Sequence, residues 1–198
     1  MPDYVVWLDE KLFLWINNGW STPALDYFFT AATIAGNAAG WFCLGLLWTL
    51  LFGAKNLKRG AAVFTIAMVV AGLLMHGTKE LAGRDRPLEH FKKKIEAGEV
   101  TVKVPYERLT ANSFPSGHAQ AAFTAATFLA LYYRRYGALL LGMAIIVGIS
   151  RIYVAAHFPA DVAAGALIGA FFGWLAWKLD PKAPVSNVLK EPASETNV

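Results

Sequence analysis

Apolar runs separated by short polar breaks fill most of the chain. A membrane-spanning helix needs about 20 mostly apolar residues. Several of the apolar cores here are shorter, so we expect tilted helices, or helices completed by polar flanks that are buried in a bundle. The pattern predicts an all-α fold: a polytopic membrane helix bundle of six helices. Alternatively, the first two apolar runs form one long broken helix. The expected helices cover residues 22–36, 39–53, 61–75 with a continuation to 82, 119–133, 136–150 and 159–177.

The N-terminal segment, residues 3–18, has a mixed pattern. Apolar residues recur there at helical spacing with polar residues between them, which is typical of a helix lying in the membrane interface. The alternative is an extension of a spanning helix. The segment lacks the basic start and the uninterrupted apolar core of a cleaved signal peptide. The apolar positions are Val5, Leu8, Leu12, Trp15 and Ile16, and the polar ones include Asp9, Glu10 and Asn17.

Polar segments divide the chain further. The connection from 83 to 114 is long and rich in charge, and loops of that length are usually functional or mobile. The tail after Asp180 is polar and contains three prolines, so we expect it to be disordered. The sequence therefore predicts one membrane-embedded domain over residues 1–180, with an outer loop at 83–114 and a disordered tail at 181–198.

Composition supports a membrane protein independently of the pattern. Of the 198 residues, 56% are hydrophobic and 16% are charged, whereas soluble domains carry about 25% charged residues. The net charge of +4 is small and no basic run alternates with aromatic residues, so we expect no nucleic-acid partner. Cys43 is the single cysteine, so no intramolecular disulfide can form.

Threading the helices through a membrane gives an expected topology. If the basic break at 55–59 is cytoplasmic, the basic residues Arg134, Arg135 and Lys178 are cytoplasmic too, as the positive-inside rule requires. Both termini are then cytoplasmic. Apart from Lys11, this threading places eight Lys and Arg residues inside and nine outside, so charge counting does not settle the orientation. The outer basic residues need another explanation.

Four charged helix ends meet on the outer side in this threading. Charged groups in such places are costly and are usually functional. Two histidines, one lysine, two arginines and a carboxylate on one face therefore indicate a functional site. The residues are Lys79 and Arg86 at the end of the third helix, Ser116, Gly117 and His118 at the start of the fourth, Arg151 at the end of the fifth, and His157 and Asp161 at the start of the sixth.

The basic members of this group suit a phosphate. Lys79, Arg86 and Arg151 would present fixed positive charge to phosphate oxygens. Ser116 and Gly117 directly precede a helix, whose N-terminal backbone N–H groups and dipole favour an anion. We therefore expect these five residues to bind phosphate.

The two histidines suit phosphoryl transfer. Asp161 follows His157 by four residues, in the first turn of the last helix. It can reach one imidazole nitrogen, fix the tautomer and leave the other nitrogen free to attack. His118 is then free to give a proton to the leaving oxygen. Such a site needs no metal and no cofactor, and the sequence offers no convincing carboxylate cluster for Mg²⁺.

These residues form three motifs, Lys79-x6-Arg86-Pro87, Pro115-Ser116-Gly117-His118 and Ser150-Arg151-x5-His157-x3-Asp161. Together they resemble the three-part signature of the type 2 phosphatidic acid phosphatase superfamily, over residues 20–178. The resemblance implies a phosphohistidine intermediate on His157, with Asp161 orienting it and His118 protonating the leaving group. It also implies phosphate contacts from Lys79, Arg86, Ser116, Gly117 and Arg151, and an active site at the outer face of six helices. Soluble acid phosphatases and vanadium haloperoxidases share the signature, but the apolar helices favour the membrane lipid phosphatase branch.

The compact size and short outer loop resemble bacterial members that act on undecaprenyl diphosphate or phosphatidylglycerophosphate. The expected partners are a lipid phosphate substrate and membrane lipids, and the expected location is the outer face of a bacterial-type inner membrane. A lipid A 1-phosphatase and a lipid phosphotransferase are alternatives within the same family. A non-catalytic scaffold or transporter is an alternative of another class, and the complete set of His157, Asp161 and His118 counts against it.

Two further features of the sequence, a charged pair in the first motif and a row of glycines in the last helix, each allow two interpretations. Arg84 and Asp85, inside the first motif, either contact a lipid headgroup or pair locally. Gly165, Gly169 and Gly173 line one face of the last helix, and small residues at this spacing permit close helix packing. The pattern favours packing within the bundle over the seam of a homodimer.

Overall fold

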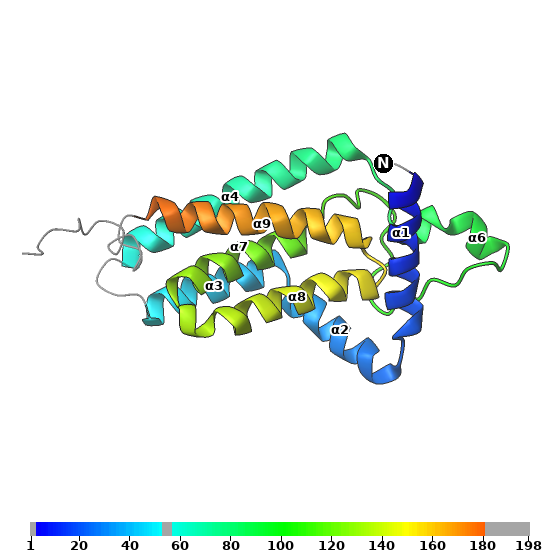
Figure 1. The fold of residues 1–198 in the computed structure, drawn as a ribbon, viewed down its shortest axis with the longest axis horizontal. Helices are drawn as coiled ribbons and strands as arrows, with labels where there is room; N and C mark the ends of the chain where they lie inside the picture. Colours follow the sequence, from blue (N-terminus) through cyan, green and yellow to red (C-terminus); the bar gives the residue numbers. More distant parts are fainter. Residues whose placement is uncertain (1–2, 53–56, 181–198) are drawn as a thin grey trace, which may run out of the picture.

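The structure, a computed structural model, describes residues 3–52 and 57–180 and contains no strand in these ranges. The predicted all-α membrane bundle is confirmed, and each of the six expected helices has a counterpart (Figure 1). The predicted tail at 181–198 lies outside the described residues. The long helices are α2 (Pro23–Ala35), α3 (Ala38–Phe52), α4 (Leu57–Ala82), α7 (Gly117–Tyr132), α8 (Gly137–Tyr153) and α9 (Pro159–Leu179). The shorter ones are α1 (Asp3–Leu14), the π-helix η1 (Trp15–Gly19), α5 (Pro87–His90), α6 (Lys92–Glu96) and the 3₁₀-helix η2 (Arg134–Tyr136).

Helices α2 and α3 form a bent pair, with an angle of 65° between Pro23–Ala35 and Ala38–Leu47. The break lies at Gly36 and Asn37. The Asn37 side chain accepts a hydrogen bond from the backbone N–H of Gly40 (2.7 Å) and donates one to the carbonyl of Ile34 (3.0 Å), so it caps the start of α3. Each of the two alternatives, two separate helices or one long broken helix, therefore holds in part. The region contains two helices, and they follow one another directly with a sharp bend between them.

Among the described residues, three segments are long and apolar enough to cross a membrane, or four if the bent pair of α2 and α3 counts as one span. Helix α1 and the end of α9 lie at opposite ends of the bundle (Figure 1), whereas the expected threading placed both termini on one side. The side of the membrane that each end faces stays a prediction.

Helix α7 is the centre of the bundle, and its alanines Ala119, Ala122, Ala125 and Ala126 are fully buried. It packs most closely against α9, where glycines remove the side chains that would separate the two backbones. A Cβ atom on Gly165, Gly169 or Gly173 would lie 2.3, 2.3 or 2.5 Å from the carbonyl oxygens of Ser116, Gln120 and Thr124, respectively. This face of α9 is therefore occupied by α7 and is not available as a dimer seam.

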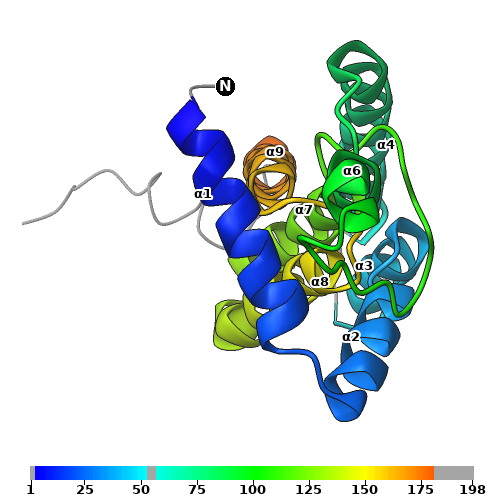
Figure 2. The same ribbon diagram turned by 90° about the vertical axis from the view of Figure 1, so that its right-hand side faces the viewer.

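Helix α1 runs across one end of the bundle, at a steep angle to the long helices (Figures 1 and 2). Phe13 is fully buried and packs against Phe91 and Phe158, with ring centroids 5.8 and 5.4 Å apart. The opposite face exposes Tyr4 and Trp7. The exposed residues also include the predicted apolar positions Val5, Leu8, Leu12 and Trp15, whereas Asp9 and Asn17 are buried. The placement of the helix in the membrane interface stays a prediction.

Candidate active site

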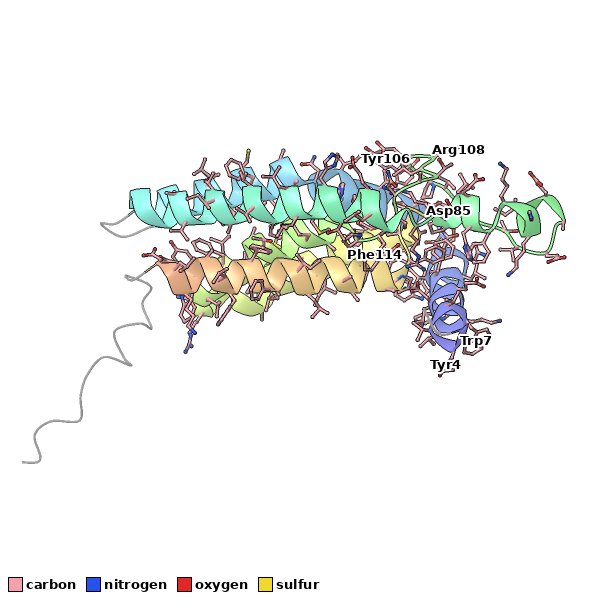
Figure 3. All side chains as sticks on the ribbon, turned by 90° about the horizontal axis from the view of Figure 1, so that it is seen from above. Tyr4, Trp7, Asp85, Tyr106, Arg108 and Phe114 are labelled. Atoms are coloured by element: carbon pink, nitrogen blue, oxygen red, sulfur yellow. The ribbon has the colours of Figure 1, made fainter. Side chains whose placement is uncertain are left out.

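The end of the bundle that α1 crosses is also where the predicted site residues gather. Helices α4 and α8 end there, and α7 and α9 begin there (Figure 1). The loop from 83 to 116 covers this end and includes α5 and α6; Asp85, Tyr106, Arg108 and Phe114 from this segment lie on the α1 side of the molecule (Figure 3). The four helix ends that the sequence predicted to share one side therefore do so.

His157 lies in the turn between α8 and α9 and is 2% exposed. The turn reverses through Ala155, which has a φ of +60°, and the backbone N–H groups of Ala156 and His157 both donate to the carbonyl of Arg151 (3.0 and 3.1 Å). Burial lowers the pKa of His157 to about 3; Asp161 acts in the opposite direction, and the charges of Arg86 and Arg151 add to the lowering. The imidazole is therefore neutral at physiological pH, as a nucleophile must be.

Asp161 is fully buried at the start of α9, but it does not make the expected hydrogen bond to His157. Its Oδ2 atom lies 3.8 Å from Nδ1 of His157, which is too long for a hydrogen bond. The reason is that other donors occupy both oxygens: Nη1 of Arg84 on Oδ1 (2.5 Å), and the Ser113 hydroxyl (2.5 Å) and the Phe158 backbone N–H (2.8 Å) on Oδ2. Nδ1 of His157 is buried without a hydrogen-bond partner.

The three predicted phosphate-binding cations are held by neutral oxygens. Arg86 donates from Nε to the carbonyl of Ala111 (2.7 Å) and from Nη1 to the carbonyl of Ala156 (2.9 Å). Lys79 donates to the carbonyl of Asn112 (3.4 Å), and Nη1 of Arg151 donates to the Thr33 hydroxyl (2.5 Å). Burial lowers the pKa of Arg86, with nearby carboxylates opposing it.

None of these three cations forms an ion pair with a carboxylate in the described part of the chain. Nε of Arg151 is buried and has no hydrogen-bond partner. The site therefore carries positive charge that no neighbouring ion pair balances, together with a buried donor that points to no protein acceptor. Both properties favour an anion.

Ser116, Gly117 and His118 form the start of α7. The Ser116 side chain caps the helix by accepting from the backbone N–H of Ala119 (3.5 Å), and its own backbone N–H donates to the carbonyl of Asp161 (3.0 Å). His118 lies within electrostatic reach of His157, Lys79 and both arginines. The structure thus brings together all eight residues that were predicted to catalyse or to bind phosphate.

Arg84 and Asp85 differ from each other. Arg84 forms ion pairs with Asp9 and Asp161, which lie 75 and 77 residues away in the sequence and are not local partners, whereas Asp85 is exposed. Sequence reasoning missed Asp9, Thr33 and Ser113 as neighbours of the site. Ser113 lies within the stretch NSFPSGH and its position was a usable signal, but Asp9 and Thr33 lie in apolar helices and carry no motif.

Among the described residues, no group of three or more His, Cys, Asp or Glu side chains could hold a metal ion.

Residues 60–184 match the family described as the PAP2 superfamily. The chain belongs to this superfamily. It is 35% identical over 116 residues to a lipid A 1-phosphatase of Rhizobium etli, covering 59% of this chain and 48% of that protein. It is 36% identical over 141 residues to an undecaprenyl-diphosphatase of Sulfolobus acidocaldarius, covering 70% of this chain and 64% of that one.

Among solved structures, the crystal structure of LpxE from Aquifex aeolicus is similar to this PAP2 protein. The TM-score is 0.72 and the sequence identity 32%, over 86% of this chain and 95% of that one. The chain spans about half the length of the Rhizobium relatives that it matches.

Proposed function

We propose that this PAP2 protein is an integral membrane lipid phosphatase that works through a phosphohistidine. The observation that carries the proposal is a buried, neutral His157 beside three cations whose hydrogen-bond partners are neutral oxygens. A phosphate group would supply the missing negative charge, and it would accept from the unpaired Nε of Arg151. The six apolar helices favour a substrate whose phosphate is attached to a lipid.

The reaction then has two steps. In the first, Nε2 of His157 attacks phosphorus, the bond from phosphorus to the lipid oxygen breaks, and His118 gives its proton to that oxygen. In the second, His118 takes a proton from water, the water oxygen attacks phosphorus, and the bond between phosphorus and nitrogen breaks. Lys79, Arg86 and Arg151, with the backbone at Ser116 and Gly117, stabilise the charge on the phosphate oxygens in both steps.

The test is phosphate release by the purified protein in detergent, with the His157→Ala variant as control. Release by the wild type and none by the variant supports the proposal. A wild type that releases no phosphate from any lipid phosphate overturns it in favour of a non-catalytic membrane protein. Adding a second lipid as acceptor distinguishes hydrolysis from phosphotransfer, because a transferase would phosphorylate that lipid instead of releasing phosphate.

The favoured substrates are undecaprenyl diphosphate and phosphatidylglycerophosphate. The relatives' names support including lipid A 1-phosphate beside undecaprenyl diphosphate. The three lipid phosphates should be presented in the same micelles. A comparison of their kcat/KM values identifies the preferred substrate. A much faster turnover of lipid A 1-phosphate would replace the two favoured substrates.

We further propose that the protein lies in a bacterial-type inner membrane with the site on the outer face. On the fold described above, α1 then lies outside and α9 ends in the cytoplasm. A cysteine introduced at exposed Lys92, in a variant with Cys43 replaced by serine, tests this in intact cells. Labelling by a membrane-impermeant maleimide is expected, and labelling only after cell lysis would reverse the orientation.

A further inference from the structure

Helix α1 contacts the candidate active site through one buried carboxylate. Asp9 is 4% exposed. Its Oδ1 atom accepts from the backbone N–H of Ala160 (2.8 Å), in the first turn of α9, and its Oδ2 atom accepts from Nη2 of Arg84 (2.7 Å). A buried carboxylate is stable only where donors replace the lost water. Asp9 therefore fixes α1 to both α9 and the loop that carries Arg84.

Arg84 extends this contact to Asp161. Its Nη1 atom donates to Oδ1 of Asp161 (2.5 Å), and its guanidinium lies 4.4 Å from the ring centroid of Phe158. Its backbone carbonyl accepts from the N–H of Ser113 (2.8 Å), and the Ser113 hydroxyl donates to Oδ2 of Asp161 (2.5 Å). Arg84 thus holds one oxygen of Asp161 directly and the other through Ser113.

We infer that Asp9 is a positioning residue for His157, acting through Arg84 and Asp161. The inference rests on the proposed function, together with the orientation of His157 by Asp161 that the family resemblance implies. Arg84 is shared between two carboxylates, so it neutralises neither of them fully. Asp161 therefore keeps negative charge to direct at Nδ1 of His157, 3.8 Å away. Without the charge on Asp9, Arg84 would pair with Asp161 alone and would weaken the attraction of Asp161 for the imidazole.

Two conservative variants of neighbouring carboxylates on α1 provide the test. Asp9→Asn keeps an oxygen for the Ala160 N–H and removes the charge. Glu10→Gln is the matched control, because Glu10 also joins α1 to the loop, through His90 (2.7 Å) and Lys94 (3.6 Å), but has no contact with Arg84 or Asp161. The measurement is the burst of 4-nitrophenol from 4-nitrophenyl phosphate, with the full chain in detergent.

We expect Asp9→Asn to slow the burst about tenfold with KM nearly unchanged. Losses of this size are common for residues that orient a catalytic group through another residue. Glu10→Gln should stay within about twofold of the wild type, as is usual for substitutions away from such features. An Asp9→Glu variant separates charge from shape: it should keep more activity than Asp9→Asn if charge matters, and less if only the fit of the side chain matters.

A double-mutant cycle shows whether the effect passes through Asp161. In an Asp161→Asn background, Asp9→Asn should cause no further loss, whereas independent effects on folding would multiply. If Asp9→Asn does not fold, Arg84→Gln takes its place in the same cycle. A wild type that releases neither 4-nitrophenol nor phosphate would contradict the proposed function itself. A wild-type burst with equal rates for Asp9→Asn and Glu10→Gln, or with losses that multiply, would contradict only this inference.

Discussion

The Gly165 Cα on α9 lies against the backbone carbonyl of Ser116, so closely that a Cβ would be 2.3 Å from that oxygen. The same residue pair joins the helix seam to the site, because Ser116 caps α7 and binds the carbonyl of Asp161 through its backbone N–H. The contact between Gly165 and Ser116 therefore packs α7 on α9 and also fixes the position of the predicted phosphate-binding turn.

Substitution Gly165→Ala should impair catalysis more than it impairs folding. The added methyl group must push Ser116 away from α9, which displaces the turn at Ser116 and Gly117 from the cations. Gly173→Ala is the control, because its Cβ would approach Thr124 (2.5 Å) on the same seam, two helical turns away from the site. We expect similar losses of thermal stability, since overpacking typically costs 1–3 kcal/mol, but a kcat loss of about tenfold or more only for Gly165→Ala. Equal kcat values in the two variants would argue against a role of this contact in placing the turn.

Single-turnover experiments should distinguish the roles of His157 and His118. His157→Ala removes the nucleophile and should abolish the burst with every substrate. His118→Ala removes the proton donor, whose contribution is typically 10²–10⁴-fold. An aryl phosphate has a good leaving group and needs this proton less than a lipid phosphate does. The His118 variant should therefore keep proportionally more of its burst on the aryl substrate. A burst from His157→Ala, with none from His118→Ala on either substrate, would reverse the two roles.

Chelation should leave activity intact, since Lys79, Arg86 and Arg151 supply the positive charge that a divalent cation supplies elsewhere. The purified protein should keep its lipid phosphatase activity in excess EDTA. Loss of activity in EDTA and recovery on adding Mg²⁺, with Ca²⁺ as a comparison, would overturn the mechanism.

Acid should destabilise the protein partly through His157. Its pKa in the folded protein is about 3, below the ordinary value of 6.5. The stability associated with the neutral, buried ring is complete above pH 6.5 and is lost progressively as the pH falls from 6.5 towards 3, because only the unfolded chain binds the proton there. Between pH 7.5 and 5 the wild type should lose about 2 kcal/mol more unfolding free energy than His157→Gln. Parallel losses in denaturant titrations of the two proteins would show that His157 is not the titrating group.

The sequence predicted the helices well, and it predicted which charged residues lie together at one end of the bundle, because both leave local signals. Apolar runs specify α4, α8 and α9 within a few residues, and fixed spacing places Arg151, His157 and Asp161 on adjoining ends of α8 and α9. The partners of Asp161 were not predictable in the same way. Ser113 and Arg84 lie 48 and 77 residues away, and which of several donors reaches a carboxylate depends on tertiary packing rather than on periodicity.

The bend between α2 and α3 was not predictable for a related reason. Residues 22–53 contain enough apolar positions for two helices or for one broken helix. Asn37 caps the start of α3, and at the 65° bend Val147 of α8 lies against Gly36, where a Cβ would be 2.6 Å from its methyl carbons. That contact joins residues more than a hundred positions apart and has no signature in the local pattern.

The neutral oxygens that hold Lys79, Arg86 and Arg151 have a consequence for the end of the catalytic cycle. On the proposed function, a cage that attracts a phosphate ester because its own charge is unbalanced attracts the liberated inorganic phosphate for the same reason. We therefore expect product departure, rather than bond cleavage, to limit turnover. The enzyme would accordingly run fastest where free phosphate is scarce, and it would slow down by itself wherever phosphate accumulates.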